Sequence, residues 1–382
     1  MQAALSRIID RIGHARARGQ ALAIRGGGTK AFYGGPVLGE PLEIGELAGV
    51  SSYEPTELVV TARAGTPLAE LEAALAERGQ CLPFEPPRFA PGGTVGGTVA
   101  AGLAGPARAY VGSVRDHVLG VTLLNGNGEV LTFGGQVAKN VAGYDVSRLM
   151  AGSLGILGVI CEISLKVLPA PRCTATAVLE LDEAPALERL QAWASKPLAL
   201  SGTAWYSGRL FVRMTGASSA VDAAAGKIGG ARVGPAEADA WWSSLRDQSH
   251  PFFSMEREES DHAGRVVQPS TAGVSTVTPQ AASASSLWRL SVPAIAPPLS
   301  LPGEQWIEWH GALRWWRTSA APEAVRAAAA KAGGHATLMR GGDRSKGVFM
   351  PLSDALMDLH RRLKQAFDPA GLFNRGRFYP EL

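Results

Sequence analysis

Short apolar runs in the first 171 positions predict strands with a few helices between them. These runs indicate three buried strands, at Ala21 to Arg25, Glu57 to Ala64 and Gly158 to Leu168. Two more strands, Val118 to Leu124 and Glu129 to Phe133, flank the sequence Asn-Gly-Asn-Gly at 125–128, which is a strong hairpin signal. Because strands and helices do not alternate regularly, the pattern favours an α+β domain over a doubly wound sheet.

Helical spacing occurs twice in this part of the chain. Apolar residues recur at intervals of three and four from Leu68 to Leu75, between Pro67, which suits a first helical turn, and Gly79. Met1 to Arg18 has the same spacing, with Arg and His between its apolar residues. Because that stretch has no uninterrupted apolar core, it is not expected to be a secretory signal.

The second half mixes strands and helices around one polar segment. The predicted strands are Thr174 to Leu181, Leu210 to Met214 and Trp306 to Trp316, and the predicted helices are Ala184 to Ala194, Pro322 to Lys331 and Leu352 to Phe367. Residues 255–286 contain mainly Glu, Ser, Thr, Ala, Gln and Gly, with few large apolar side chains. We expect this segment to be a mobile insertion outside the core.

Glycine and tryptophan divide the chain. Of the 46 glycines, 28 precede residue 171, whereas all nine tryptophans follow it. Glycine lets a backbone approach a ligand closely, while tryptophan supplies packing area. We therefore predict two domains, 1–171 and 172–382, with the cofactor in the first.

Charge and cysteine content exclude several classes of function. The 37 basic and 34 acidic residues give a formal net charge of +3, and no run of five basic residues marks a nucleic-acid surface. No apolar stretch approaches the roughly 20 residues that cross a bilayer, so a cytoplasmic location is expected. Three cysteines without a C-x-x-C pair cannot hold an iron–sulfur cluster by themselves.

Two known motifs fit only in part. Residues 26–31 match the spacing G-x-G-x-x-G/A, but Phe32-Tyr33-Gly34-Gly35-Pro36 would break the helix that a Rossmann turn opens. Residues 151–155, A-G-S-L-G, depart from the nucleophile elbow of hydrolases and precede a predicted strand. The seven histidines form no zinc-binding pattern, so no metal site is predicted.

A stronger signal is P-G-G-T-V-G-G-T at 91–98. Four glycines in six residues leave backbone N–H groups uncovered by side chains, and such a donor surface can bind a pyrophosphate. The alternative is a glycine-rich turn that only permits tight packing. Three further glycine segments, at 26–28, 143–145 and 152–160, favour the ligand.

Five segments, in this order, resemble the FAD-binding domain of the vanillyl-alcohol-oxidase-like, or PCMH-type, flavoproteins. They are R-G-G-G at 25–28, P-G-G-T-V-G-G-T at 91–98, S-V-R-D-H-V-L-G at 113–120, K-N-V-A-G-Y-D at 139–145 and G-S-L-G-I-L-G-V-I at 152–160. Within that superfamily, residues 139–155 and the C-terminal F-D-P-A-G-L-F-N-R-G-R-F-Y-P-E are most similar to the E-subunit family of bacterial glycolate oxidases. L-W-R-L-S-V-P at 287–293 and G-G-H-A-T-L-M-R at 333–340 extend the similarity over nearly the whole chain outside the insertion.

The resemblance implies a PCMH-type FAD-binding domain of two α+β subdomains, followed by an α/β cap domain over the flavin ring. The FAD-binding residues that it implies are Arg25, Gly26, Gly27, Gly28, Thr29, Pro91, Gly93, Thr94, Gly96, Gly97, Arg115, Asp116, Gly143, Asp145, Gly152, Ser153, Gly155, Gly158 and Ile160. Some members attach FAD through a histidine at the position of Thr29. Non-covalent FAD is therefore expected here.

The resemblance also implies a function within a complex. The chain would be the FAD-binding subunit of a glycolate oxidase that converts glycolate or a related 2-hydroxy acid into the 2-oxo acid. Its implied partners are a homologous D-like flavoprotein subunit and an F-like iron–sulfur subunit, which would bring it to the inner face of the membrane. The G-D-G-N-x-H and E-H-G patterns of related D-2-hydroxyacid dehydrogenases are missing. A flavin-free structural or assembly subunit is the alternative.

Oxidation of a 2-hydroxy acid requires a cation for the carboxylate and a base for the hydroxyl proton. The candidates in the second half are His310, Arg314 and His335, which lie near aromatic residues. On the predicted strand Trp306 to Trp316, His310 and Arg314 would share one face because they are four residues apart. The alternative is that all three pair with carboxylates or backbone groups in the cap.

Overall fold

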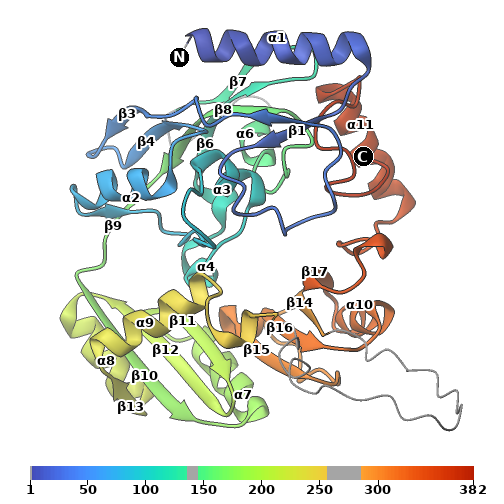
Figure 1. Cartoon of the computed structure of the whole chain (residues 1–382). Helices are drawn as coiled ribbons and strands as arrows, with labels where there is room; N and C mark the ends of the chain where they lie inside the picture. Colours follow the sequence, from blue (N-terminus) through green and yellow to red (C-terminus); the bar gives the residue numbers. More distant parts are fainter. Residues whose placement is uncertain (1, 136–144, 256–284) are drawn as a thin grey trace, which may run out of the picture.

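The computed structural model describes residues 2–135, 145–255 and 285–382, which form two stacked bodies, each built on an antiparallel sheet (Figure 1). Most of the segment expected to be a mobile insertion, and residues 139–144 of one FAD motif, lie outside the described residues. Within the described ranges, no helix is long and apolar enough to cross a bilayer.

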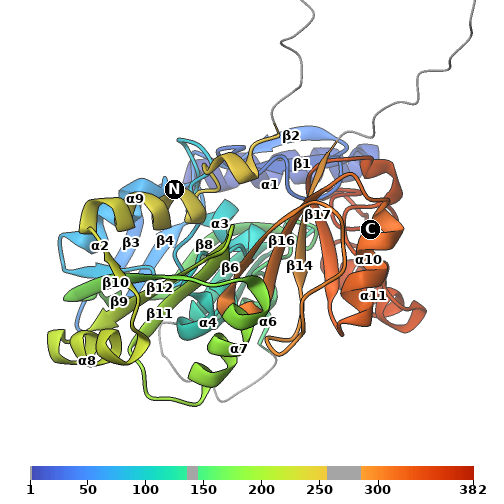
Figure 2. The ribbon, with the colours of Figure 1, turned by 90° about the horizontal axis from the view of Figure 1, so that it is seen from below.

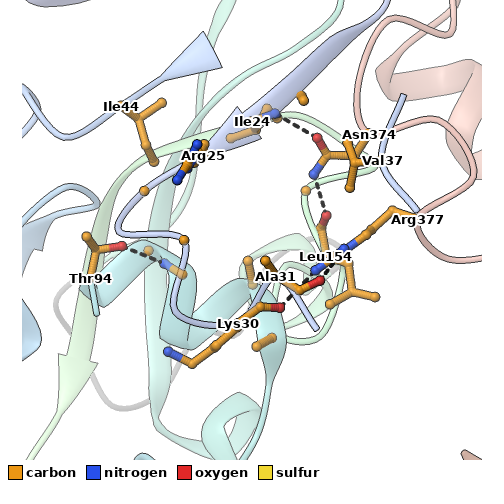
Figure 3. A pocket seen from close by; sticks show the side chains of 18 of the residues that line it. Ile24, Arg25, Lys30, Ala31, Val37, Ile44, Thr94, Leu154, Asn374 and Arg377 are labelled. Carbon is orange, nitrogen blue, oxygen red and sulfur yellow. Dashed lines mark hydrogen bonds between the residues drawn. The ribbon is translucent and has the colours of Figure 1, made fainter. Parts of the chain in front are cut away.

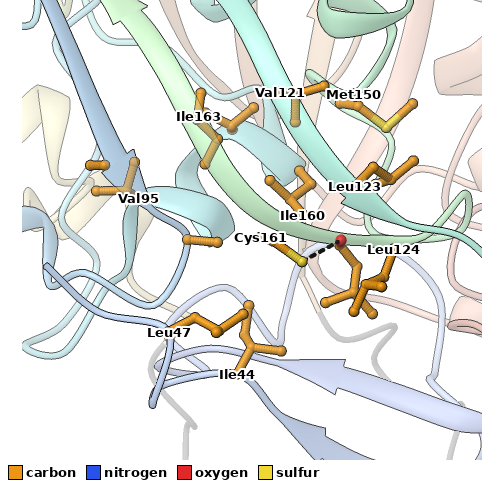
Figure 4. Packing of buried hydrophobic residues seen from close by; sticks show 14 of the residues in the cluster. Ile44, Leu47, Val95, Val121, Leu123, Leu124, Met150, Ile160, Cys161 and Ile163 are labelled. Atoms are coloured by element: carbon orange, nitrogen blue, oxygen red, sulfur yellow. Dashed lines mark hydrogen bonds between the residues drawn. The ribbon is translucent and has the colours of Figure 1, made fainter. Parts of the chain in front are cut away.

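The first body contains a five-stranded sheet, and several of its strands form where the sequence has short apolar runs. In sheet order its strands are β3 (Val50–Glu54), β4 (Val59–Arg63), β8 (Val159–Lys166), β6 (Val118–Leu124) and β7 (Val130–Gly134). The β6–β7 hairpin forms as predicted, because the Asn125 side chain accepts hydrogen bonds from the N–H groups of Asn127 and Glu129 while Gly128 adopts a φ of 80°. Val121 and Ile163 meet in the core beneath this sheet (Figure 4).

Short helices and two small ladders complete this body. Its helices are α1 (Gln2–Arg18), α2 (Leu68–Ala76), α3 (Val95–Ala101), α4 (Arg108–Val111), α5 (Val114–His117) and α6 (Val146–Leu149). The two ladders pair β1 (Leu22–Arg25) with β2 (Glu40–Glu43) in parallel and β5 (Gln80–Cys81) with β9 (Leu168–Pro169) in antiparallel. The strand and helix predicted around Pro67 are confirmed to within a few residues.

The second body is an eight-stranded antiparallel sheet with helices. In sheet order its strands are β13 (Ala231–Val233), β10 (Cys173–Glu180), β12 (Arg209–Gly216), β11 (Leu200–Tyr206), β15 (Glu304–Glu308), β16 (Leu313–Thr318), β14 (Ser286–Ser291) and β17 (His335–Gly341). Its helical segments are α7 (Glu183–Ala194), α8 (Ser218–Ile228), α9 (Pro235–Arg246), η1 (Pro251–Phe253), η2 (Trp309–Gly311), α10 (Pro322–Lys331) and η3 (Arg344–Lys346). Seen from below, β16, β14 and β17 run side by side (Figure 2).

The two faces of this sheet are covered differently. Residues of α7, α8 and α10 pack on one face, in clusters that include Leu187, Val221 and Val325. The opposite face meets the first body, and its cluster combines Trp306 with Tyr33 and Leu154 from the first body. A site at the contact of the two bodies can therefore draw on side chains from both.

The C-terminal segment returns to the first body. Helix α11 (Asp354–Phe367) is followed by Leu372 and Phe373, which are fully buried in the core of the first body (Figure 1). Leu22 of β1 donates its N–H to the carbonyl of Leu372 at 2.7 Å. The division at residue 171 stays our proposal for the two domains. The contacts of Leu372 and Phe373 show in addition that C-terminal residues pack in the core of the first body.

One predicted strand is wrong. Residues Trp306 to Trp316 were expected to run straight, but they form β15, the one-turn η2 and β16, which pair with each other as a hairpin. Trp309, His310 and Gly311 all have positive φ, between 51° and 93°, and this left-handed turn reverses the chain. The sequence did not reveal the turn, because both arms contain large apolar residues and only Gly311 is an ordinary turn signal.

Candidate functional site

A cavity of about 490 Å³ opens between β1, the start of α3 and the segment before β8 (Figure 3). Glycine backbone forms much of its wall. The predicted FAD-binding residues that line it are Arg25, Gly26, Gly27, Gly28, Thr29, Thr94, Gly96, Gly97, Gly155, Gly158 and Ile160. The structure thus brings three glycine segments, far apart in sequence, around one space.

The first loop follows β1 and needs glycine for two reasons. A Cβ atom on Gly27 would collide with the carbonyl oxygen of Gly92 in the second loop. Gly28 has a φ of 69°, which side-chain-bearing residues rarely adopt. No helix follows this loop within residues 29–39, so the Rossmann alternative is excluded here.

The second loop leads into α3. Thr94 is the N-cap of that helix, and its hydroxyl accepts a hydrogen bond from the N–H of Gly97 at 3.2 Å. Gly96 packs against the residue that follows β4, where an added Cβ would lie 2.6 Å from the Cβ of Ala64. Gly97 lines the cavity. The first glycine of this pair therefore serves packing, and the second leaves space for a ligand.

The third segment, residues 152–158, is joined to α3 by backbone hydrogen bonds. Gly152 donates its N–H to Val99, and Leu154 donates to Ala100 at 2.8 Å. Leu154 and Gly155 both have positive φ, so the chain turns tightly around the cavity.

Lys30 lines the cavity, as the cations Arg25 and Arg377 also do, and no sequence motif indicated a role for it. Burial lowers the pKa of Lys30 to about 8. Within the described residues its ammonium group has no hydrogen-bond or carboxylate partner, and it lies 6.0 Å from the ring centroid of Phe89. An amine buried without a counter-ion beside glycine N–H donors suits an anionic ligand.

The C-terminal segment holds the first loop in place. The side chain of Asn374 accepts the N–H of Ile24 at 2.7 Å and donates to the carbonyl of Leu154 at 2.7 Å (Figure 3). Arg377 donates to the carbonyls of Lys30 and Ala31 at 2.9 and 3.0 Å. Asn374 and Arg377 lie in the motif F-D-P-A-G-L-F-N-R-G-R-F, which the sequence analysis singled out. The sequence alone did not indicate that these side chains bind the first glycine loop.

Several predicted FAD-binding residues do not line the cavity. These residues are Pro91, Gly93, Arg115, Asp116, Asp145, Gly152 and Ser153. Asp116 forms the capping box of α5 with Ser113, and Asp145 caps α6 by accepting the N–H of Arg148. Both carboxylates therefore have structural partners within the protein. Gly143 lies outside the described residues.

The candidate catalytic residues are separated by the η2 turn. His310 lies in the turn, where its Nδ1 is 2.6 Å from the Tyr110 hydroxyl of α4, so it links the two bodies. Burial lowers the pKa of His310. Arg314 is fully buried on the face of α7, where it donates to the carbonyls of Gly311 and Ala296. The expectation that His310 and Arg314 share a strand face is wrong because the chain reverses between them.

His335 begins β17 with an exposed side chain. Its pKa is lowered by partial burial and then by the charge of Arg289. The three candidates thus occupy three different surroundings. Whether any of them acts in catalysis stays a prediction.

Comparisons with known proteins agree with this geometry. A family model described as an FAD binding domain matches residues 5–134. Glycolate oxidase subunit GlcE of Escherichia coli (strain K12) is 44% identical over 375 residues, which cover 98% of this chain and 97% of that protein. This chain belongs to the GlcE family. It is a flavoprotein of the FAD-linked oxidoreductases, and it binds FAD.

More distant relatives match a smaller share of the chain or match it at lower identity. D-lactate dehydrogenase of Anaerostipes hadrus is 32% identical over 40% of this chain and 31% of that protein. Glycolate oxidase subunit GlcD of Bacillus subtilis (strain 168) is 31% identical over 39% of this chain and 31% of that protein. A solved structure of alkyldihydroxyacetonephosphate synthase matches 96% of this chain and 74% of its own with a TM-score of 0.61 and 15% identity. That likeness confirms the PCMH-type α+β fold expected from the GlcE motifs.

Proposed function

We propose that this chain is the FAD-holding subunit of a glycolate oxidase complex and takes part in oxidising glycolate or a related 2-hydroxy acid to the 2-oxo acid. The observation that carries the proposal is the glycine-walled cavity. Two loops bring uncovered backbone to one space, with Lys30 beside them and a clamp from the C-terminus behind them. When bound, FAD supplies the acceptor for the two electrons of the substrate.

The chain's own residues would hold the cofactor as follows. The N–H groups of Gly27 and Gly28, which line the cavity, would donate to the pyrophosphate, as backbone nests do. Gly97 would leave space for the phosphates, while its own N–H is donated to the Thr94 hydroxyl. Lys30 would neutralise part of its charge. Ile160 and Leu154 supply an apolar wall on the β8 side.

The link to FAD is proposed to be non-covalent. The cavity wall contains no histidine or cysteine among its described residues, and Thr29 occupies the position where some PCMH-type proteins carry the attaching histidine. Acid precipitation of the yellow protein should release all of its flavin into the supernatant. Flavin that stays on the denatured chain would show a covalent bond.

Electrons are proposed to leave through partners. Three cysteines, Cys81, Cys161 and Cys173, are too few for a four-thiolate cluster on this chain. We propose a homologous D-like flavoprotein and an F-like iron–sulfur subunit as partners, with the assembly at the inner face of the membrane. The deciding experiment measures the flavin content of the purified chain and glycolate-dependent dye reduction with and without the partners. Pure chain without flavin absorbance would favour the alternative, a flavin-free assembly subunit.

A further inference from the structure

The sheet face that meets the first body carries an arginine without a polar partner. Arg289 lies in the middle of β14, directly opposite Trp315 of β16, whose indole N–H donates to Glu308 at 2.6 Å. These three side chains are therefore on the face whose cluster includes Tyr33 of the FAD cavity. The arginine thus faces the cofactor domain and is turned away from α10.

Arg289 makes no hydrogen bond or ion pair within the described residues. Its guanidinium carbon lies 5.1 Å from the ring centroid of Trp309, and the side chain is partly buried. Arg340 of β17, on the same sheet, has such partners: it donates to the carbonyl of Phe253 at 2.8 Å and to the side chain of Gln248 at 3.1 Å. An unpaired guanidinium at such a position lacks the partners that burial usually requires.

A second cation is close to the first. The guanidinium carbon of Arg108, in α4, lies 4.4 Å from the centroid of the same Trp309 ring. Within the described residues it also has no hydrogen-bond or carboxylate partner, and its side chain is exposed. Burial and then the charge of Arg289 lower the pKa of Arg108. The Trp309 indole is therefore in contact with two guanidinium groups, whose positive charges repel each other.

Glu308 is the carboxyl group whose charge acts on Arg289. Burial raises the pKa of Glu308 to about 8, despite the opposing effects of the Trp315 hydrogen bond and the Arg289 charge. The raised pKa favours the neutral form of Glu308, so this carboxyl group offsets the charge of Arg289 only in part. Arg108 has a different anion near it, because the charge of Asp116 raises its pKa.

Tyr33 connects this charge to the FAD cavity. It lines the cavity, and its phenol hydroxyl has no hydrogen-bond partner within the described residues. Burial raises the pKa of Tyr33, while the charges of Arg289 and Arg377 lower it, so Arg289 acts on the hydroxyl from the sheet side. The Tyr33 hydroxyl thus lies at the cavity, and Arg289, which does not line the cavity itself, acts on that hydroxyl from the sheet face that packs against Tyr33.

We propose that Arg289 binds the carboxylate of a small 2-hydroxy acid, with the Tyr33 hydroxyl as a second donor and Arg108 as the outer cation that attracts it. The substrate class rests on the proposed function. A guanidinium forms two parallel hydrogen bonds to a carboxylate, and stacking on an indole leaves its edge free for them. This places carboxylate binding on this chain, at Arg289 and away from the buried Arg314.

The test titrates the FAD-loaded full chain with oxalate. This dicarboxylate has no C–H hydrogen to transfer to the flavin, so it binds without being oxidised. We expect saturable changes in the flavin absorbance and in the tryptophan fluorescence. Arg289→Met should weaken oxalate binding about 10- to 100-fold, and Arg289→Lys should restore part of the affinity. Tyr33→Phe should cost several-fold. Arg108→Met should mainly reduce the dependence of binding on salt. The control is Arg317→Met, which removes a cation paired with Glu304 on the same sheet.

Two results would overturn the inference: an oxalate affinity unchanged in Arg289→Met, or a wild-type chain that does not respond to oxalate. Sulfate that competes as well as glycolate would overturn the carboxylate assignment. If Arg289→Met does not fold, the oxalate affinities of Arg289→Lys and Arg289→Gln are measured in its place by the same titrations. The proposed function fails separately: a chain that binds oxalate through Arg289 but never retains FAD supports the inference alone.

Discussion

At the scale of single residues, Gly97 is the sharpest test of the FAD assignment. It lines the cavity, and a Cβ atom there would meet only the Thr94 hydroxyl, at 3.1 Å. Gly97→Val should therefore fold yet lose at least about tenfold in FAD affinity, because its side chain holds the phosphates away from the N–H donors. The control is Gly226→Val, in α8, where an added Cβ meets nothing within 4 Å. Full flavin occupancy in Gly97→Val would contradict the phosphate-loop assignment.

Lys30 should make FAD binding depend on pH. Because its pKa in the FAD-free chain is about 8, the amine is charged at pH 7 and mostly neutral at pH 9.5. A bound pyrophosphate favours the charged form, so affinity should stay constant below about pH 7.5 and fall by roughly tenfold or more as the pH rises past 8. Flavin fluorescence titrations between pH 6.5 and 9.5 measure this. Lys30→Met should bind about tenfold more weakly at pH 7 and show no such slope, whereas Lys331→Met should behave as the wild type.

The residues that could be predicted from sequence are those whose chemistry is local. Glycines at 26–28 and 96–97 are recognisable because backbone that approaches a ligand excludes side chains. The roles of Lys30, Asn374 and Arg289 depend on segments that meet only in the folded chain. For Asp116 and Asp145 the sequence similarity implied contact with FAD, whereas the structure shows that both side chains cap helices.

At the scale of elements, the C-terminal helix is attached through one buried ion pair. Lys364 of α11 donates to Asp368 at 2.8 Å, to the carbonyl of Ile156 at 2.7 Å and to that of Phe373 at 2.8 Å. The Asp368 side chain is fully buried and accepts the N–H groups of Leu372 and Phe373. The pair thus joins α11, the cavity segment before β8 and the clamp behind the first loop.

Removing this cation should be costly. Lys364→Met leaves Asp368 buried with an unpaired charge, and the free energy of unfolding should fall by about 3–5 kcal/mol in a urea titration. Arg361→Met, on the same helix, breaks an exposed pair with Asp358 and should cost less than about 1 kcal/mol. Equal midpoints for the two variants would show that the buried pair does not anchor the C-terminus.

Elements were predictable where their periodicity was uninterrupted, as in α2, α7, α10 and the β6–β7 hairpin. The failure at Trp306 to Trp316 has a physical cause. Both arms of the β15–β16 hairpin contain large apolar residues, and the turn between them uses positive φ at Trp309 and His310, residues that rarely adopt it. The contact between the indole of Trp309 and the carbonyl of Gly105, at 3.0 Å, helps to hold this turn. This hydrogen bond joins one body to the other, so no local sequence pattern predicts it.

At the scale of the whole molecule, the tryptophans do not form the surface for partners. Seven of the nine are buried, and the other two, Trp205 and Trp241, are partly buried. They pack the two faces of the eight-stranded sheet, which explains their concentration in the second half. Contacts with partner subunits must therefore use other residues, among which Leu356 and Leu359 of α11 are exposed apolar side chains.

The final prediction concerns where the reaction is completed. A carboxylate site at Arg289 would let this chain bind glycolate, but reduced flavin turns over only when its electrons leave. Because the G-D-G-N-x-H and E-H-G patterns of the related dehydrogenases are missing, and because three cysteines cannot form a four-thiolate cluster that accepts electrons from the flavin, the chain alone should reduce an artificial dye with glycolate slowly or not at all.

Added partners, a D-like flavoprotein and an F-like iron–sulfur subunit, should raise that rate at least about tenfold. The measurement compares dye reduction by the chain, by the partners and by the assembly at equal flavin content. Gly97→Val in the assembly distinguishes the two roles of this subunit. If its flavin carries electrons, the assembly loses activity along with the FAD of this chain. If the subunit only supports assembly, activity stays at the wild-type level while the complex remains intact by size-exclusion chromatography. An isolated chain as fast as the assembled enzyme would overturn the requirement for partners, because electrons would then leave its flavin without them.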